Sequence, residues 1–275
     1  MLTALAMIAF ASNSIICRLA LGNELIDPAS FSTIRLVSGA VTLYIIIRLK
    51  RTTKQRHPGS WISAAMLFLY AIAFSFAYVS LNAGIGALIL FGSVQITMIF
   101  VGIATGERPH ILNWSGFFVA LAGLIYLVLP GIEAPSFLGA SLMTTAGVSW
   151  GVYSLRGMAI SNPAAVTADN FLRSAPMAIL ASLCYIINLN VSAKGFLLAL
   201  ISGAVTSGVG YVIWYAALKN LSATRAATVQ LLVPIIAAIG GVLLLSEQIS
   251  FRLFLAGILI IGGVGLTLIS KGKSG

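Results

Sequence analysis

Long apolar segments alternate with short polar ones along the whole chain. Charged residues are absent from residues 61–103, 113–132 and 134–155. A helix of about 20 apolar residues spans the roughly 30 Å hydrocarbon core of a bilayer. Such a helix also satisfies its own backbone hydrogen bonds, whereas a β-barrel would show short alternating segments. The pattern predicts ten membrane-spanning helices, at residues 3–21, 29–49, 61–81, 84–104, 113–131, 137–157, 166–187, 196–217, 223–244 and 250–270.

Composition supports the same fold class. The 275 residues are 59% apolar and 8% charged, and the mean hydropathy is +1.05. A water-soluble domain carries about a quarter charged residues. We therefore expect an all-α membrane protein. The net charge of +10 comes from basic residues at the edges of the predicted spans, with no binding module between them, so no nucleic-acid partner is expected.

The chain also contains an internal repeat. FAYVSLN at 76–82 resembles IWYAALK at 213–219, and residues 106–128 resemble residues 246–269. The offset of 137 to 140 residues pairs Ser12 with Ser149, Arg35 with Arg173, Glu107 with Glu247 and Gly123 with Gly263. Two repeats of five helices are expected, at residues 1–131 and 137–275. Because five is odd, the second repeat would be inverted. Inverted repeats are typical of transporters with a central site exposed alternately to the two sides.

Basic residues predict the orientation. If the N-terminus is cytoplasmic, three of them lie at outside ends, namely Arg18, Lys194 and Arg252. The eleven expected inside are Arg48, Lys50, Arg51, Lys54, Arg56, Arg108, Arg156, Lys219, Arg225, Lys271 and Lys273. This positive-inside bias predicts that both termini are cytoplasmic. The first span lacks a basic n-region and has a repeat partner at 137–157, so we expect it to be retained rather than cleaved.

Each repeat then shows the same order of features: an aromatic residue within a helix, a glutamate, and a glycine-rich final helix. One copy runs from Tyr78 through Glu107 to Gly123, and the other from Tyr215 through Pro234 and Glu247 to Gly263. This pattern resembles the EamA-type drug/metabolite transporters, and within them the YddG-type exporters of aromatic amino acids. In the first copy Val94 stands where the second has Pro234.

The resemblance implies ten helices, no cofactor, and export of small metabolites from the bacterial cytoplasm. The expected location is the bacterial inner membrane, with a small-molecule substrate, surrounding lipid and a monomeric state. The expected function is secondary transport of aromatic amino acids or related compounds. Export of other amino acids or drugs, and a channel-like facilitator, stay open as alternatives.

Aromatic side chains supply the first candidate site residues. Tyr211, Trp214 and Tyr215 share one face of the predicted 196–217 helix. Tyr70, Phe74 and Tyr78 share one face of the 61–81 helix, and the 137–157 helix adds Trp150 and Tyr153. Rings can stack on a planar substrate and attract a cation. We expect Tyr78, Trp150, Tyr153, Tyr211 and Trp214 to line a central cavity. Ordinary packing or an interfacial aromatic belt is the alternative, and Tyr70 fits packing.

Polar residues inside the spans supply the others. Ser12, Asn13 and Gln95 are expected to contact substrate, although hydrogen bonds between helices are the alternative. Arg35 and Arg173 are the cations well inside predicted spans; their recurrence favours a scaffold role, and contact with substrate is the alternative. Arg173 is expected to pair with Asp169, one turn before it, and Arg35 to reach the outer surface with its long side chain.

No enzyme is expected. The chain lacks a phosphate-binding glycine-rich loop, an HExxH zinc signature and a GxSxG elbow. Neither a carboxylate nor a histidine is expected near the middle of the membrane. The sequence therefore predicts no catalytic, cofactor-binding or metal-binding residues.

Overall fold

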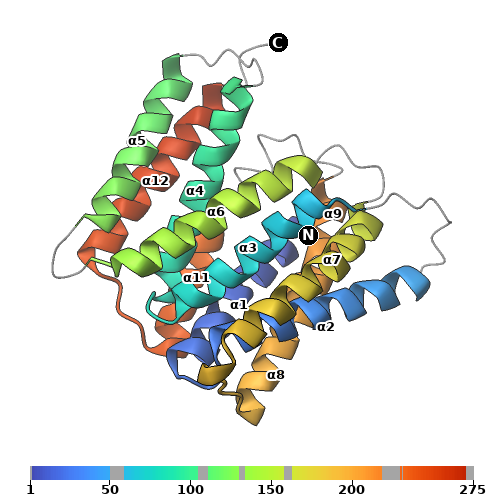
Figure 1. Ribbon diagram of the computed structural model, residues 1–275. Helices are drawn as coiled ribbons and strands as arrows, with labels where there is room; N and C mark the ends of the chain where they lie inside the picture. The colour runs from blue at the N-terminus through green and yellow to red at the C-terminus, as the bar shows by residue number, and fades with distance from the viewer. Residues whose placement is uncertain are drawn as a thin grey trace.

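A computed structural model describes residues 2–49, 59–104, 111–129, 134–157, 163–218, 230 and 232–270. These residues form an all-helical bundle (Figure 1). Its helices are α1 (Leu2–Gly22), α2 (Pro28–Leu49), α3 (Trp61–Tyr78), α4 (Ala83–Ala104), α5 (Ile111–Val128), α6 (Phe137–Gly157), α7 (Pro163–Cys184), α8 (Ala193–Ile201), α9 (Gly210–Leu218), α11 (Leu232–Leu245) and α12 (Phe251–Ser270). A short 3₁₀ turn, η1 (Ile186–Asn188), follows α7, and a π-helix, η2 (Ser202–Val209), joins α8 to α9.

The predicted spans agree with these helices to within a few residues at most ends. The span predicted at 166–187 begins earlier, at Pro163, because proline is well suited to the first turn of a helix. The first part of the span predicted at 223–244 lies outside the described residues. So do Glu107 and all of the basic residues expected on the cytoplasmic side except Arg48 and Arg156.

The outer surface suits a membrane. Four helical segments are long and apolar enough to cross a bilayer, namely Leu2–Gly22, Pro28–Leu49, Trp61–Tyr78 and Ala193–Ala217. Shorter apolar segments accompany them at Ala83–Met98, Trp114–Leu127, Leu232–Leu245 and Phe251–Gly263. Large apolar side chains such as Leu172 and Leu243 are 65% and 75% exposed. Such a surface is stable against lipid tails and is unfavourable in water.

Helices from the two ends of the chain pack against one another. The α1 helix packs against α11 and against the continuous α8–η2–α9 helix, while α6 packs against α3 and α4. The α2 helix packs against α7. The α5 and α12 helices lie side by side beyond α4, at the upper left of Figure 1. The centre of the molecule is therefore built from α1, α3, α4, α6 and α8–η2–α9.

The α2 helix approaches η2 closely at Gly203. A Cβ atom added at Gly203 would lie 1.9 Å from Ser38 Oγ and 2.2 Å from the Arg35 carbonyl oxygen. Only glycine fits at such a distance, as is common where membrane helices pack tightly. The π turn that contains Gly203 widens the helix locally, and such turns are frequent at functional sites.

The structure contradicts the expectation that Arg35 reaches the surface. Its side chain is 2% exposed. Packing of α2 against α7, η2 and α3 covers it, and polar and aromatic partners inside the bundle hold the guanidinium there. The expected Asp169–Arg173 pair is confirmed, with Arg173 Nε 3.0 Å from Asp169 Oδ2.

We expect Gly203→Ala to lower the thermal stability of the purified protein, because the added methyl group would push α2 away from η2. Overpacking of this kind costs about 1–3 kcal/mol. Thermal unfolding followed by size-exclusion chromatography in detergent measures the effect. Gly265→Ala on α12 is the matched control, because nothing lies within 4 Å of its added Cβ. Equal stability of the two variants would contradict the close approach.

Candidate functional site

A small cavity lies at the centre of the described bundle. Side chains from α1, α3, α4, α6, η2 and α9 line it: Phe10, Asn13, Tyr70, Phe91, Trp150, Thr206 and Tyr211. Its volume is about 10 Å³, which is room for about one water molecule. A larger guest therefore requires the helices around it to separate.

Rings form most of the wall. Trp150 lies 4.9 Å from Tyr70 and 5.0 Å from Tyr211, measured between ring centroids. Phe10 meets both Trp150 and Tyr211 edge-on, at 5.9 Å and 6.1 Å. These distances fall within the range at which aromatic pairs attract each other. With Phe91 of α4, the five rings of the lining come from five different helices, so the cavity is an aromatic junction rather than one helical stripe.

Polar groups sit between the rings. Asn13 Oδ1 accepts hydrogen bonds from Ser202 Oγ at 2.6 Å and from Thr206 Oγ1 at 3.0 Å. Trp150 Nε1 and the Tyr211 hydroxyl are buried and lack a hydrogen-bonding partner among the described residues. Buried polar atoms are nearly always paired in proteins. These two groups are therefore available to a guest molecule.

A buried cation adjoins the cavity. Arg35 Nη2 donates to the hydroxyl of the cavity residue Tyr70, and Arg35 Nε donates to Ser207 Oγ, each at 3.0 Å. The guanidinium carbon lies 5.1 Å from the ring centroids of both Tyr70 and Phe74. Arg35 Nη1 is buried and without a partner in the part of the chain that the structure describes.

Three of the eight residues predicted for the site line this cavity, namely Asn13, Trp150 and Tyr211. Trp214 is buried one turn beyond Tyr211 and packs edge-on against Phe10 at 5.7 Å, so it supports the wall from behind. Tyr153 contacts Trp150 at 5.7 Å, but it lines a separate small pocket with Arg156 and Tyr215.

The other predicted residues lie outside the lining. Tyr78 is fully buried, with its ring 4.7 Å from Phe74 and its hydroxyl donating to the Ala83 carbonyl oxygen at 3.3 Å. Gln95 is buried on α4, one turn beyond the lining residue Phe91. Ser12 is half-buried on α1 beside Asn13.

Sequence reasoning missed Phe10, Phe91 and Thr206, and assigned Tyr70 to packing. Phe10 lies three residues before Asn13, on the same face of α1. That spacing was available from sequence. Thr206 faces the cavity from η2, and sequence reasoning gave no sign of a π-helix at this position.

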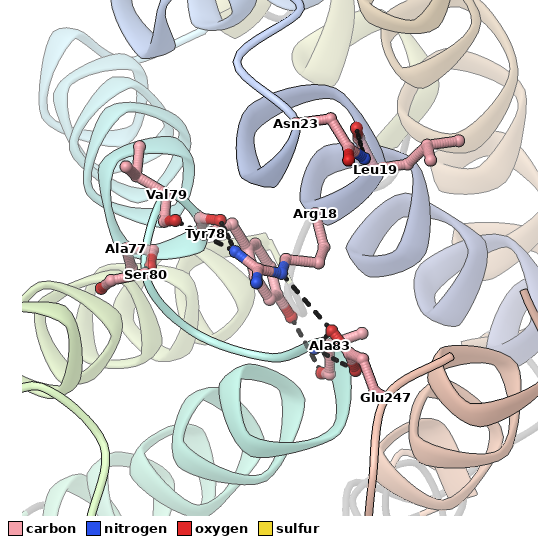
Figure 2. Close-up of polar contacts among 9 residues, drawn as sticks. All are labelled: Arg18, Leu19, Asn23, Ala77, Tyr78, Val79, Ser80, Ala83 and Glu247. Atoms are coloured by element: carbon pink, nitrogen blue, oxygen red, sulfur yellow. Dashed lines mark hydrogen bonds and ion pairs between the residues drawn. The ribbon is translucent and has the colours of Figure 1, made fainter. Parts of the chain in front are cut away.

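One end of the bundle is closed by a contact between Arg18 and Glu247 (Figure 2). Arg18 Nε lies 3.4 Å from Glu247 Oε1, and Arg18 Nη1 donates to the carbonyl oxygens of Tyr78 and Val79 at 3.2 Å and 3.0 Å. Both Glu247 oxygens accept from the Ala83 amide at the start of α4, at 2.9 Å and 3.0 Å. This Arg18–Glu247 contact therefore ties α1, the α3–α4 connection and the α11–α12 connection together.

The Glu247 carboxylate is held by opposing effects. Partial burial raises its pKa, whereas the Ala83 amide and the Arg18 guanidinium oppose that rise. Glu247 follows Ser246, whose φ of 55° is an unusual left-handed conformation for a residue other than glycine. The strained turn is the local geometry that aims Glu247 at α4, where a negative charge is favourable near a helix N-terminus.

The opposite end is closed by different contacts. Arg156, at the end of α6, donates to Ser63 Oγ at 3.0 Å and to Ser60 Oγ at 3.2 Å. Asn170 of α7 accepts from the Ser60 amide at 3.0 Å. These contacts join α3, α6 and α7. Contacts at both ends of the described bundle therefore hold together the helices that surround the small central cavity.

The chain matches known proteins along its length. A sequence profile of the EamA-like transporter family matches residues 1–129 and again residues 137–269. An uncharacterized protein of Pseudomonas aeruginosa is 47% identical over 268 residues, covering 98% of this chain and 93% of that protein. A probable amino-acid metabolite efflux pump of Escherichia coli is 25% identical over 211 residues, covering 70% of each chain. One crystal structure covers 99% of this chain and 98% of its own, with a TM-score of 0.67 at 19% identity, which supports the fold.

We expect Glu247→Gln to expose the buried thiol of Cys17, which directly precedes Arg18. An uncharged amide removes the ion pair, and a hydrogen bond to a charged group contributes about 1.5–3 kcal/mol. The open population should rise on the order of tenfold. The rate of labelling of Cys17 by a membrane-impermeant maleimide measures it, in a Cys184→Ser background because Cys184 is exposed.

Arg252→Gln is the matched control for that experiment. Like Arg18, Arg252 is partly exposed, but it donates to the Leu129 carbonyl oxygen just after α5 rather than pairing with Glu247. Its labelling rate should equal that of the parent protein. Equal rates for Glu247→Gln and the parent would show that the contact does not hold this end closed.

Proposed function

This chain belongs to the EamA-like transporter family, and on that premise we propose that it is a secondary transporter that exports aromatic amino acids or related aromatic metabolites. A membrane transporter with a small-molecule substrate is the class of the family. The observation that carries the finer proposal is the buried ring-lined cavity in which Trp150 meets Tyr70 and Tyr211 at about 5 Å. Such a wall offers ring faces to a planar guest.

Polar atoms in the same cavity support an amino-acid substrate. Its carboxylate and ammonium groups both need partners when water is excluded. The Tyr211 hydroxyl and Trp150 Nε1 have no hydrogen-bonding partner among the described residues, so they can bind the carboxylate. The ring faces attract a cation and can therefore bind the ammonium group. The Escherichia coli relative named as a probable amino-acid metabolite efflux pump supports the same substrate class and the outward direction.

The closures at the two ends support alternating access. A carrier exposes its site to one side at a time, so at least one end is closed in every state. The Arg18–Glu247 contact closes one end, and Arg156 with Ser60 and Ser63 closes the other. We infer that transport opens these two sets of contacts in turn, and that the contracted cavity belongs to an occluded state.

Helix packing supports two inverted repeats, at residues 1–131 and 137–275. The α1 helix packs against α8–η2–α9 and α11, and α6 packs against α3 and α4. If α6 is the counterpart of α1, each of these two helices packs against the third and fourth spans of the other repeat. The second spans of the two repeats, α2 and α7, pack against each other, and so do the fifth spans, α5 and α12. Exchange of the two repeats therefore leaves each of these pairs unchanged. We propose a monomer in the bacterial inner membrane with both termini cytoplasmic, in accord with the distribution of basic residues.

We expect Trp150→Ala to weaken transport of phenylalanine about fivefold and to leave that of a small aliphatic amino acid almost unchanged. Loss of one stacking ring removes on the order of 1 kcal/mol. Initial rates of uptake into liposomes that contain equal amounts of reconstituted protein measure both substrates.

Trp114→Ala is the matched control, because Trp114 is 37% exposed on α5 and stacks on Phe118, away from the cavity. It should transport both substrates as the parent does. Equal losses for both substrates in Trp150→Ala would assign that ring to packing and end the proposed aromatic site.

The proposed topology has its own test. Cysteines placed at Lys54 and Lys273, in a background without native cysteines, should react with an impermeant maleimide from the cytoplasmic side. A cysteine at Ser136 should react from the other side, because Ser136 Oγ bonds Ser80 Oγ near the Arg18–Glu247 contact. Labelling of Lys54→Cys and Lys273→Cys from opposite sides would rule out the ten-helix arrangement.

A further inference from the structure

Arg35 carries a buried positive charge that no acidic side chain neutralises among the described residues. Two of the described carboxylates form ion pairs with other arginines, Glu247 with Arg18 and Asp169 with Arg173. Asp27 is occupied at the start of α2, where it accepts from the amide of Ser30 at 2.8 Å. Arginine stays protonated in proteins, so the charge on Arg35 cannot be removed by loss of a proton.

Comparison of the two repeats shows that the missing counter-ion is a feature of the sequence. Arg173 has Asp169 four residues before it, on the same face of α7. With the offset of 138 residues that relates Arg35 to Arg173, the position of Asp169 is occupied by Phe31. Phe31 is fully buried. The first repeat therefore keeps the arginine and lacks its acid.

The cation lies next to the proposed substrate cavity. Arg35 Nη2 binds the hydroxyl of Tyr70, whose ring forms part of the cavity wall. Arg35 Nε binds Ser207, the neighbour in sequence of the lining residue Thr206. These bonds use two of the three guanidinium nitrogens, and Nη1 has no partner among the described residues.

We propose that Arg35 binds the carboxylate of the substrate, so that the site accepts aromatic carboxylates, including amino acids, and discriminates against the corresponding amines. This inference rests on the proposed aromatic site. A buried charge without a partner is unfavourable, and a carboxylate supplies both the missing charge and an acceptor for Nη1. Charge-assisted bonds of this kind are about twice as strong as neutral ones.

The same arrangement accounts for substrate orientation. The carboxylate would lie against α2 and η2, where Arg35 and Ser207 meet. The ring would then extend toward Phe10, Trp150 and Tyr211. Movement of the Tyr70 side chain away from Arg35 would free a donor on Nη2 and allow a bidentate contact with the carboxylate.

The test measures binding of four probes to the purified protein in nanodiscs by isothermal titration calorimetry. Phenylalanine and phenethylamine differ by the carboxylate, and leucine and isoamylamine repeat that comparison without a ring. We expect phenylalanine to bind at least ten times more tightly than phenethylamine. If phenethylamine binds as tightly as phenylalanine, the carboxylate contact is overturned. This comparison uses only the parent protein, so it does not depend on the folding of a variant.

Variants then assign the discrimination to Arg35. Arg35→Gln should weaken phenylalanine binding about tenfold and leave phenethylamine binding unchanged, whereas Arg35→Lys should retain part of the preference. Arg173→Gln is the matched control, because Arg173 is the repeat counterpart that already has an acidic partner. It should bind all four probes as the parent does. Equal weakening of acid and amine by Arg35→Gln would overturn the assignment and leave Arg35 as a packing residue.

The two proposals fail separately in this design. Suppose that leucine binds as tightly as phenylalanine and that Arg35→Gln weakens leucine binding. This result would support the carboxylate contact and overturn the aromatic substrate. Suppose instead that phenethylamine binds as tightly as phenylalanine and more tightly than both aliphatic probes. This result would support the aromatic substrate and overturn the carboxylate contact.

Discussion

Inside a membrane-embedded bundle, each polar group must find its partner within the protein, because lipid offers none. The centre of this molecule is organised by that requirement. Asn13 of α1 binds Ser202 and Thr206 of η2, and Arg35 of α2 binds Tyr70 of α3 and Ser207 of η2. These bonds connect helices far apart in sequence and hold the rings of the cavity wall in place. The groups that stay unpaired in the described part of the chain, Arg35 Nη1, Trp150 Nε1 and the Tyr211 hydroxyl, are those that a substrate can satisfy.

The two ends are held by similar contacts, each with a carboxylate that pairs with an arginine and accepts from a backbone amide near the start of a helix. At one end, Glu247 combines a charge pair with Arg18 and bonds to the amide at the start of α4. At the other end, Arg156 donates to two serine hydroxyls, and the Asp169 carboxylate pairs with Arg173 and accepts from the Gly59 amide just before α3. Charge-assisted bonds therefore oppose the opening of either end in the described conformation. A substrate that shifts this equilibrium must bind more tightly to the open state than to the closed one.

The sequence predicted the helices well because the periodic absence of charge reflects a strong constraint, the thickness of the hydrocarbon core. It predicted the Asp169–Arg173 pair because that contact lies within one helix, and it identified Asn13, Trp150 and Tyr211, which line the cavity together. Local spacing could not bury Arg35 against Tyr70, because packing between helices decides that contact. Phe10 could have been found from its spacing to Asn13 on α1, whereas no local signal marked Phe91 or Thr206 as residues of the wall.

Counterflow in liposomes tests the proposed carrier most directly. Liposomes that contain the reconstituted protein are loaded with unlabelled phenylalanine and diluted into a trace of labelled phenylalanine. A carrier with one central aromatic site should accumulate the label transiently above its equilibrium level, and external tryptophan should compete while an aliphatic amino acid competes weakly. Label that only approaches equilibrium, at a rate that does not saturate with concentration, would contradict alternating access and indicate a channel-like path.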